Sequence, residues 1–109
     1  MSLNIEVKFD NDNNQLLVIP NGDLDIYTSN KFKEKIMNSF EKNQGDIFID
    51  GSKLDYVDST GLGALISILK SVKDTDHKII VTNLKPNIKK LFEITELDKV
   101  FTIRGEGDD

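Results

Sequence analysis

Apolar and polar residues alternate at the start of the chain. The apolar positions are Leu3, Ile5, Val7 and Phe9. This period of two predicts a strand with one buried face. Asn and Asp residues at 11–14 favour a turn, because their side chains bond to the nearby backbone and tolerate left-handed conformations. A second apolar segment, Gln15 to Pro20, then predicts an antiparallel hairpin. Segment 21–25 is expected to break this second strand and to lead into a helix.

After this break, apolar residues recur at the spacing of a helix. Thr28 or Ser29 is expected to cap the helix, and Gly45 to end it. The predicted apolar face consists of Phe32, Ile36, Met37 and Phe40.

The second half of the chain places short apolar runs between helical patterns. Segment 46–50 is apolar without alternation, which is typical of a central strand covered on both faces. Segment 51–57 is expected to be a loop, and a second helix is expected to begin near Ser59. The predicted buried stripe of that helix is Leu62, Leu65, Ile66, Leu69 and Val72.

The last part of the chain predicts one more strand and one more helix. Segment 77–82 is solidly apolar at its centre, and Pro86 fits the first turn of a helix, where its missing N–H leaves no hydrogen bond unmade. Segment 100–103 predicts a short edge strand. The third helix is expected to bury Ile88, Leu91 and Phe92.

The order of these elements defines the expected fold class, which is α/β. A hairpin followed by βα units implies a mixed sheet of four to five strands, packed with about three helices. Right-handed crossovers should join the parallel strands. We expect a single domain over residues 1–104 and a flexible acidic tail over 105–109.

Composition narrows the possible environment and partners. The 109 residues include no cysteine, so disulfides are excluded and a reducing compartment, the cytoplasm, is expected. The formal net charge of −5 argues against nucleic acid and anionic membranes as partners, because both need a basic surface. The longest purely apolar run, Leu16 to Ile19, is too short to span a bilayer.

The segment between the predicted loop and the second helix carries the candidate chemistry. Asp58 and Ser59 are residue types that cap helices, so Ser59 should lie exposed at a helix N-terminus. At 100° per residue, Ser59, Gly63, Ser67 and Lys70 share one small, polar face. This face could be a docking surface, or simply the solvent-exposed face of any amphipathic helix.

Catalytic and metal-binding interpretations of these residues are weaker. Ser59 as a nucleophile would need a base, and His77, the single histidine, lies at the far end of the helix in sequence. Asp23, Asp25 and Asp58 lack the spacing of a calcium loop. Gly61 and Gly63 lack the Lys-Ser/Thr ending of a phosphate-binding loop. We therefore expect no catalytic, cofactor or metal residues, and consider Ser59 instead as an acceptor of phosphate.

Three segments together are similar to one family. Asp58-Ser59-Thr60-Gly61-Leu62-Gly63 resembles the phosphorylation motif of bacterial anti-sigma-factor antagonists, which are single-domain STAS proteins. Gly22-Asp23-Leu24-Asp25 resembles their second signature, and Leu91-Phe92-Glu93-Ile94-Thr95-Glu96-Leu97 their third, with Glu93 and Glu96 in place of the usual Asp and Gly. The Ser-Thr pair and the short tail are most similar to the general-stress branch.

The resemblance implies a regulatory switch rather than an enzyme. Ser59 would be phosphorylated by an anti-sigma factor that is also a serine kinase, and a serine phosphatase would reverse the modification. The unmodified protein would bind the anti-sigma factor and so release a sigma factor. The partner-binding residues would be Asp23, Asp25, Asp58, Thr60, Gly61, Gly63 and Ser67.

Two alternatives remain at this point. One is a STAS accessory domain in a transport or lipid-trafficking system, against which the Asp58-Ser59 pair counts. The other is a small hydrolase or nucleotide-binding enzyme, for which a base and a phosphate loop are lacking.

Overall fold

The computed structural model describes residues 2–105. The elements in chain order are β1 (Leu3–Asp10), β2 (Gln15–Leu24), α1 (Ser29–Lys42), β3 (Asp46–Asp50), β4 (Leu54–Val57), α2 (Ser59–Lys73), β5 (Ile79–Thr82), α3 (Pro86–Ile94), the 3-10 helix η1 (Leu97–Lys99) and β6 (Thr102–Arg104). The tail expected over 105–109 lies outside the described residues except for Gly105, so its boundary stays a prediction.

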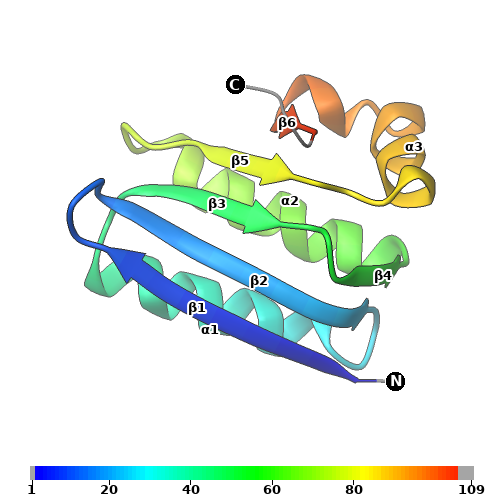
Figure 1. Ribbon diagram of the computed structural model, residues 1–109, viewed down its shortest axis with the longest axis horizontal. Coiled ribbons are helices and arrows are strands. Elements are labelled where there is room, and N and C mark those ends of the chain that lie inside the picture. The colour runs from blue at the N-terminus through cyan, green and yellow to red at the C-terminus, as the bar shows by residue number, and fades with distance from the viewer. Residues whose placement is uncertain (1, 106–109) are drawn as a thin grey trace.

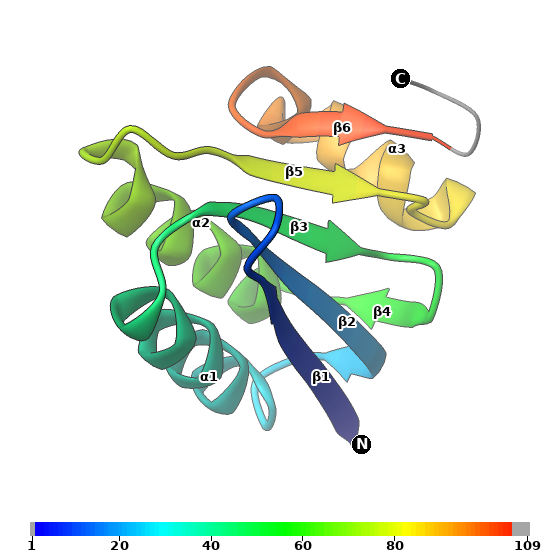
Figure 2. The same ribbon diagram turned by 60° about the vertical axis from the view of Figure 1, so that its left-hand side comes forward.

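The strands form one mixed sheet in the order β1-β2-β3-β5-β6, and β4 pairs with β2. β1 and β2 are antiparallel, whereas all the other pairs are parallel. Helices α1 and α2 lie on the same face of the sheet (Figures 1 and 2). This confirms the predicted α/β class, with a hairpin, βα units and, within residues 2–105, three α-helices. In the same range the sheet has six strands in place of the expected four to five.

The additional strand is β4, in the segment expected to be a loop. Its two end residues, Leu54 and Val57, are buried, and the two between them are exposed. Four residues in this pattern show neither alternation nor a continuous apolar run, which explains why the sequence did not predict a strand. β4 pairs in parallel with the end of β2 and leads directly into α2.

β2 is longer than predicted and does not break at residue 21. Gly22 has φ 126°, and the β2–β4 register shifts between Gly22 and Asp23. A side chain at Gly22 would begin 2.3 Å from the Ser2 carbonyl oxygen, so only glycine fits this bulge. β2 therefore pairs with β3 near its start and with β4 at its end.

β3 is covered on one face, contrary to the prediction that both faces are buried. Ile47 and Ile49 are buried, while Phe48 between them is only partly buried. In β5, by contrast, Ile79, Ile80 and Val81 are all buried. A run of three apolar residues therefore does not by itself distinguish the two environments.

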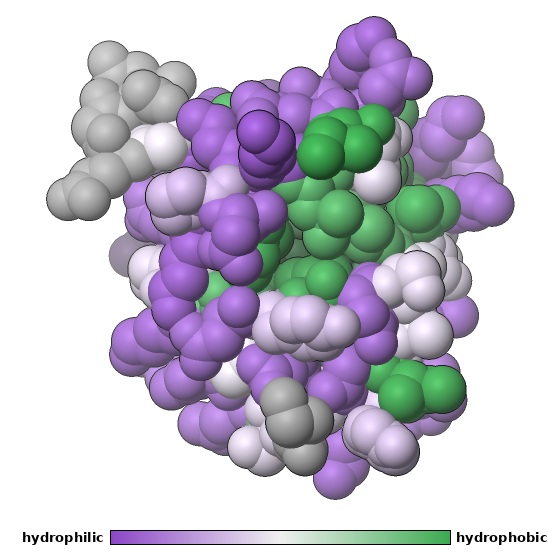
Figure 3. Space-filling view, turned by 90° about the vertical axis from the view of Figure 1, so that its right-hand side faces the viewer, coloured by the Kyte–Doolittle hydropathy of each residue, from purple (hydrophilic) through white to green (hydrophobic). Residues whose placement is uncertain are grey.

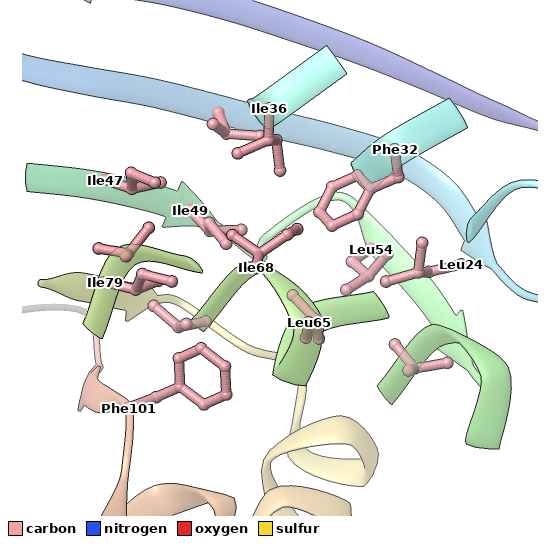
Figure 4. Packing of buried hydrophobic residues seen from close by; sticks show 14 of the residues in the cluster. Leu24, Phe32, Ile36, Ile47, Ile49, Leu54, Leu65, Ile68, Ile79 and Phe101 are labelled. Carbon is pink, nitrogen blue, oxygen red and sulfur yellow. The ribbon is translucent and has the colours of Figure 1, made fainter. Parts of the chain in front are cut away.

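The core lies between the sheet and the pair α1–α2. Figure 4 shows Ile68 of α2 at its centre, near Phe32 of α1 and Ile49 of β3. The buried face of α2 is rotated relative to the predicted stripe. Leu65 and Val72 are buried as expected, but Ala64 and Ile68 are also buried. The other three predicted positions are only partly buried: Leu62, Ile66 and Leu69.

The ends of α1 differ from the expected chemistry. Thr28 occupies the N-cap position, but its side chain does not bond to the helix. The helix ends at Lys42, before Gly45. A side chain at Gly45 would begin 2.2 Å from the Asn14 carbonyl oxygen, so this glycine permits a close approach to the β1–β2 turn in place of ending the helix. Phe32, Ile36 and Phe40 are buried as predicted, and Met37 is partly buried.

The third helix begins at Pro86, as predicted, and buries Ile88 and Phe92, with Leu91 partly buried. Its end is unusual. Glu96, which stands where the related motif has glycine, adopts a left-handed conformation with φ 60°. β6 confirms the expected edge strand, displaced toward the C-terminus, and pairs in parallel with β5.

Candidate functional site

The candidate site lies where the end of β2 meets the start of α2. The parallel β2–β4 pairing places Val57 beside Leu24. The backbone N–H of Asp58 donates to the Leu24 carbonyl oxygen over 3.2 Å. The loop after β2 and the first turn of α2, which are far apart in sequence, are thereby fixed side by side.

Gly61 makes this contact possible. A side chain there would begin 2.4 Å from the Leu24 carbonyl oxygen and 2.9 Å from its Cγ. Backbone cannot yield to such an overlap, so the position requires glycine. Gly61 is buried and has a packing role beneath the surface, while its contribution to partner binding stays a prediction.

Asp58 is the N-cap of α2. Its Oδ1 accepts a hydrogen bond from the Thr60 hydroxyl over 2.6 Å and one from the Gly61 N–H over 3.0 Å. The Thr60 hydroxyl, followed by the Gly61 N–H, lowers the pKa of Asp58 below its usual value. This carboxylate is therefore ionised at neutral pH and lies beside Ser59.

Ser59 is the first residue of α2 and is exposed. Its hydroxyl forms no hydrogen bond with any residue that the structure describes, whereas the hydroxyl of the neighbouring Thr60 is held by Asp58. Ser59 also sits where the free N–H groups and dipole of a helix favour an anion. Of the two adjacent hydroxyls, that of Ser59 is the available one.

Gly63 lies one turn further along the exposed face. A side chain added there would meet no atom of residues 2–105 within 4 Å, so the described fold does not require glycine at this position. Glycine in a helix costs roughly 1 kcal/mol relative to alanine. Ser67, a further turn along, is only partly exposed. The predicted face is therefore low and open at Ser59 and Gly63, and it ends at the exposed Lys70.

Asp23 and Asp25 flank Leu24 at the end of β2 but have different environments. Asp23 is partly exposed, and its carbonyl oxygen accepts a hydrogen bond from the Thr28 hydroxyl over 2.8 Å. Asp25 is only 4% exposed, and its Oδ1 accepts the Tyr27 N–H over 2.9 Å. Since its carboxylate is turned into the loop, Asp25 has a structural role in the free domain, and its contact with a partner stays a prediction.

Sequence reasoning missed three exposed apolar side chains near this site. Ile26 and Tyr27, between Asp25 and α1, are 63% and 79% exposed, and Tyr56 of β4 is 50% exposed. The bond from the Asp58 N–H to the Leu24 carbonyl oxygen places this loop beside the start of α2. The sequence did contain one indication of this surface, namely that Ile26 and Tyr27 are adjacent apolar residues in a segment without strand or helix periodicity.

The end of the molecule that carries the starts of α2 and α3 has a hollow apolar area surrounded by polar surface (Figure 3). Both helices bring incompletely buried apolar residues to the surface. Leu62, in the first turn of α2, is partly buried, and Ile94, the last residue of α3, is 70% exposed. The exposed helix face at Ser59 is therefore accompanied by apolar surface that a partner could cover.

The one histidine among residues 2–105, His77, is far from Ser59. His77 lies beyond the opposite end of α2, with its Nδ1 3.5 Å from Oδ1 of Asp46 and its ring edge-on to Phe40. The 15 residues of α2 separate it from Ser59 by about 20 Å. Among residues 2–105, no three His, Asp or Glu side chains form a group that could hold a metal ion.

Comparison with known proteins identifies the family. Residues 4–108 match the STAS domain, so the chain belongs to the STAS family. It is 31% identical over 110 residues to the anti-sigma-B factor antagonist of Listeria monocytogenes, covering 99% of this chain and 95% of that protein. It is 32% identical over 97 residues to the anti-sigma-B factor antagonist of Staphylococcus aureus, covering 89% and 88%. These matches confirm the resemblance found in the three sequence segments.

Solved structures share the fold. An anti-sigma factor antagonist from Mycobacterium paratuberculosis superposes with a TM-score of 0.79 at 23% identity, covering 94% of this chain and 86% of that one. The phosphorylated form of the Bacillus cell fate determinant SpoIIAA superposes with a TM-score of 0.72 at 18% identity, covering 92% and 90%. Across residues 2–105, no helix has the length and apolar character needed to cross a membrane.

Proposed function

We propose that this STAS domain is an anti-sigma factor antagonist that works in the cytoplasm as a binding protein, not as an enzyme. In its unmodified form it binds an anti-sigma factor that is also a serine kinase. Phosphorylation of Ser59 releases the complex, and a serine phosphatase restores the binding form. The names of the Listeria and Staphylococcus relatives favour this interpretation over an accessory domain or a small enzyme.

The observation that carries the proposal is that the free Ser59 hydroxyl and the open space at Gly63 lie on the same face of α2. Ser59 is exposed at the start of α2, and Gly63 leaves open space one turn away, although the fold has room for a side chain there. A glycine that the fold does not need, on the face that carries an unpartnered serine, suggests that the space belongs to a partner. Close approach of a second backbone is a known use of glycine.

The negative charge of a phosphate group on Ser59 explains how phosphorylation would switch partner binding off. Phosphate on Ser59 would add about −1.5 to −2 charge at pH 7. The N-terminus of α2 would accommodate this charge within the free domain, so folding would be preserved. In a complex the same charge would lose water beside the ionised Asp58, and desolvation and like-charge repulsion would both weaken binding.

Ile26 and Tyr27 provide the apolar part of this docking face. Tyrosine is enriched among residues that dominate binding energy, because it buries a large area with little loss of conformational freedom. Asp25 holds this pair in position, since its Oδ1 accepts the Tyr27 N–H. Asp23, Asp58, Thr60 and Ser67 complete the polar part of the face, and Gly61 supports it from beneath.

The test follows complex formation by size-exclusion chromatography with the anti-sigma factor captured from the native lysate. We expect a stable complex without ATP and its dissociation when ATP is added. Ser59→Ala should form the complex and keep it in the presence of ATP. A complex that dissociates equally for Ser59→Ala would contradict the switch, and capture of transport proteins alone would favour an accessory domain instead.

A further inference from the structure

A second site lies at the other end of α2 from Ser59. There the last two turns of the helix, the start of β5 and the η1–β6 segment line an open groove of about 530 Å³. This volume lies within the range of roughly 300–1,000 Å³ that is typical of small-molecule sites. Along α2 the groove begins at Ile66, about 10 Å from Ser59, and extends to Lys73, about 20 Å from Ser59.

The lining of the groove is apolar. Leu97 and Val72 form part of its buried floor, whereas Ile66 and Leu69 are only partly covered and Val100 is 56% exposed. Ile66 and Leu69 are also two of the three positions where α2 departs from its predicted buried stripe. The chain therefore keeps apolar residues at positions that its own core does not fully cover.

The rim of the groove is basic. Lys70, Lys73, His77 and Lys78 line it, and no Asp or Glu within residues 2–105 does. This is notable in a chain with 19 acidic and 14 basic residues. The ammonium groups of the three lysines form no ion pair with any residue in the described range 2–105, while His77 faces Asp46.

From this combination we infer that the groove binds a carboxylate with an unbranched apolar chain, a free fatty acid of medium length. The apolar tail would cover Leu69 and Val100, and the carboxylate would lie at the rim near Lys70 and Lys73. The positive charge of the lysines at the rim favours an anionic head group. The apolar floor favours a hydrocarbon tail. A protein segment fits less well. A standard protein interface buries roughly 800 Å² per partner. The groove extends along only two turns of α2, about 10 Å, and is too short to provide such an area.

The test is titration of the ¹⁵N-labelled full chain with decanoate below its micelle concentration, followed by amide chemical shifts. We expect saturable shifts centred on residues 66–73 and 97–102. Decanol, with the same tail and no charge, should bind several-fold more weakly, and decyltrimethylammonium should not bind. Each methylene removed from the acid should weaken binding about twofold to fourfold.

Charge variants separate specific recognition from simple adsorption. Lys70→Gln combined with Lys73→Gln should weaken decanoate binding about threefold to tenfold at low salt and leave decanol binding unchanged. The matched control is Lys31→Gln combined with Lys33→Gln, in the first turns of α1, which should bind decanoate like the wild type.

Three outcomes would overturn the inference. Non-saturable shifts, or equal affinity for decanoate and decanol, would mean that no anion is recognised. Amide shift changes at these residues when the protein concentration is raised without decanoate would mean that a second copy of the chain covers the groove. Saturable binding of an acidic amphipathic peptide without binding of decanoate would mean that the groove docks a protein. The proposed function would stand in each case, because it depends on Ser59.

Discussion

The Thr60 hydroxyl donates a hydrogen bond to Oδ1 of Asp58 over 2.6 Å, and the Ser59 hydroxyl between them in sequence has no partner in the described part of the chain. The two hydroxyls therefore differ in availability although they are neighbours. Loss of the hydrogen bond from the Thr60 hydroxyl would also remove the largest of the interactions that lower the pKa of Asp58.

We predict that the cognate kinase transfers phosphate to Ser59 and not to Thr60. Phosphorylation of Thr60 would break its bond to Asp58 and place two negative groups in contact. Mass spectrometry of the protein after incubation with kinase and ATP will locate the phosphate. Modification mainly on Thr60 would overturn the assignment, and Thr60→Val provides a control that should still be modified on Ser59.

Gly63→Ala should stabilise the free domain by about 0.5–1 kcal/mol, because alanine is the better helix former and the site is open. The same methyl group should weaken partner binding by about 1–3 kcal/mol if the surface there is closely packed in the complex. Urea unfolding and titration against the anti-sigma factor measure the two effects.

Gly61→Ala is the matched control for this substitution. It should destabilise the free domain, since the new Cβ would lie 2.4 Å from the Leu24 carbonyl oxygen. If Gly63→Ala stabilises the domain and leaves binding unchanged, Gly63 is not part of the docking face.

Ile68→Ala should cost about 2–5 kcal/mol of unfolding free energy, because Ile68 is fully buried at the centre of the core. Leu69→Ala should cost clearly less, since Leu69 is only partly buried at the edge of the groove. Urea midpoints of the two variants compare them directly. A larger loss for Leu69→Ala would mean that α2 faces the sheet as the sequence pattern predicted.

The difference between these two residues illustrates what the sequence can and cannot predict. The apolar period located α2, but it did not fix the rotation of the helix, because Ile66 and Leu69 are apolar without being core. The hairpin, three helices and the Asp58–Gly63 segment were predictable from local chemistry. β4 and the bulge at Gly22 were not, because both depend on tertiary pairing between segments about 30 residues apart.

The site was predictable to a similar extent. Asp58 capping and Ser59 exposure follow from residue type and position. The burial of Asp25 and Gly61 does not, because it arises from the contact of the β2 end with α2. Ile26 and Tyr27 were missed since an apolar residue in a loop gives no periodic signal of its exposure.

Glu96→Gly should stabilise the domain by about 1 kcal/mol, because Glu96 holds a left-handed conformation that disfavours any residue with a Cβ. The exposed ion pair with Lys99 that would be lost contributes little. Glu96→Ala removes the same ion pair but keeps the Cβ, so it should not stabilise. Equal thermal midpoints for Glu96→Gly and Glu96→Ala would argue against strain at this position.

The most direct measurement of the central claim is calorimetric titration of Ser59→Asp and Ser59→Ala against the purified anti-sigma factor, with thermal melts of each variant. Ser59→Ala should bind like the wild type. Ser59→Asp should melt at or slightly above the wild-type temperature and bind at least thirtyfold more weakly, which corresponds to about 2 kcal/mol. Wild-type affinity in a well-folded Ser59→Asp would show that the start of α2 is not the interface and would contradict the proposed switch.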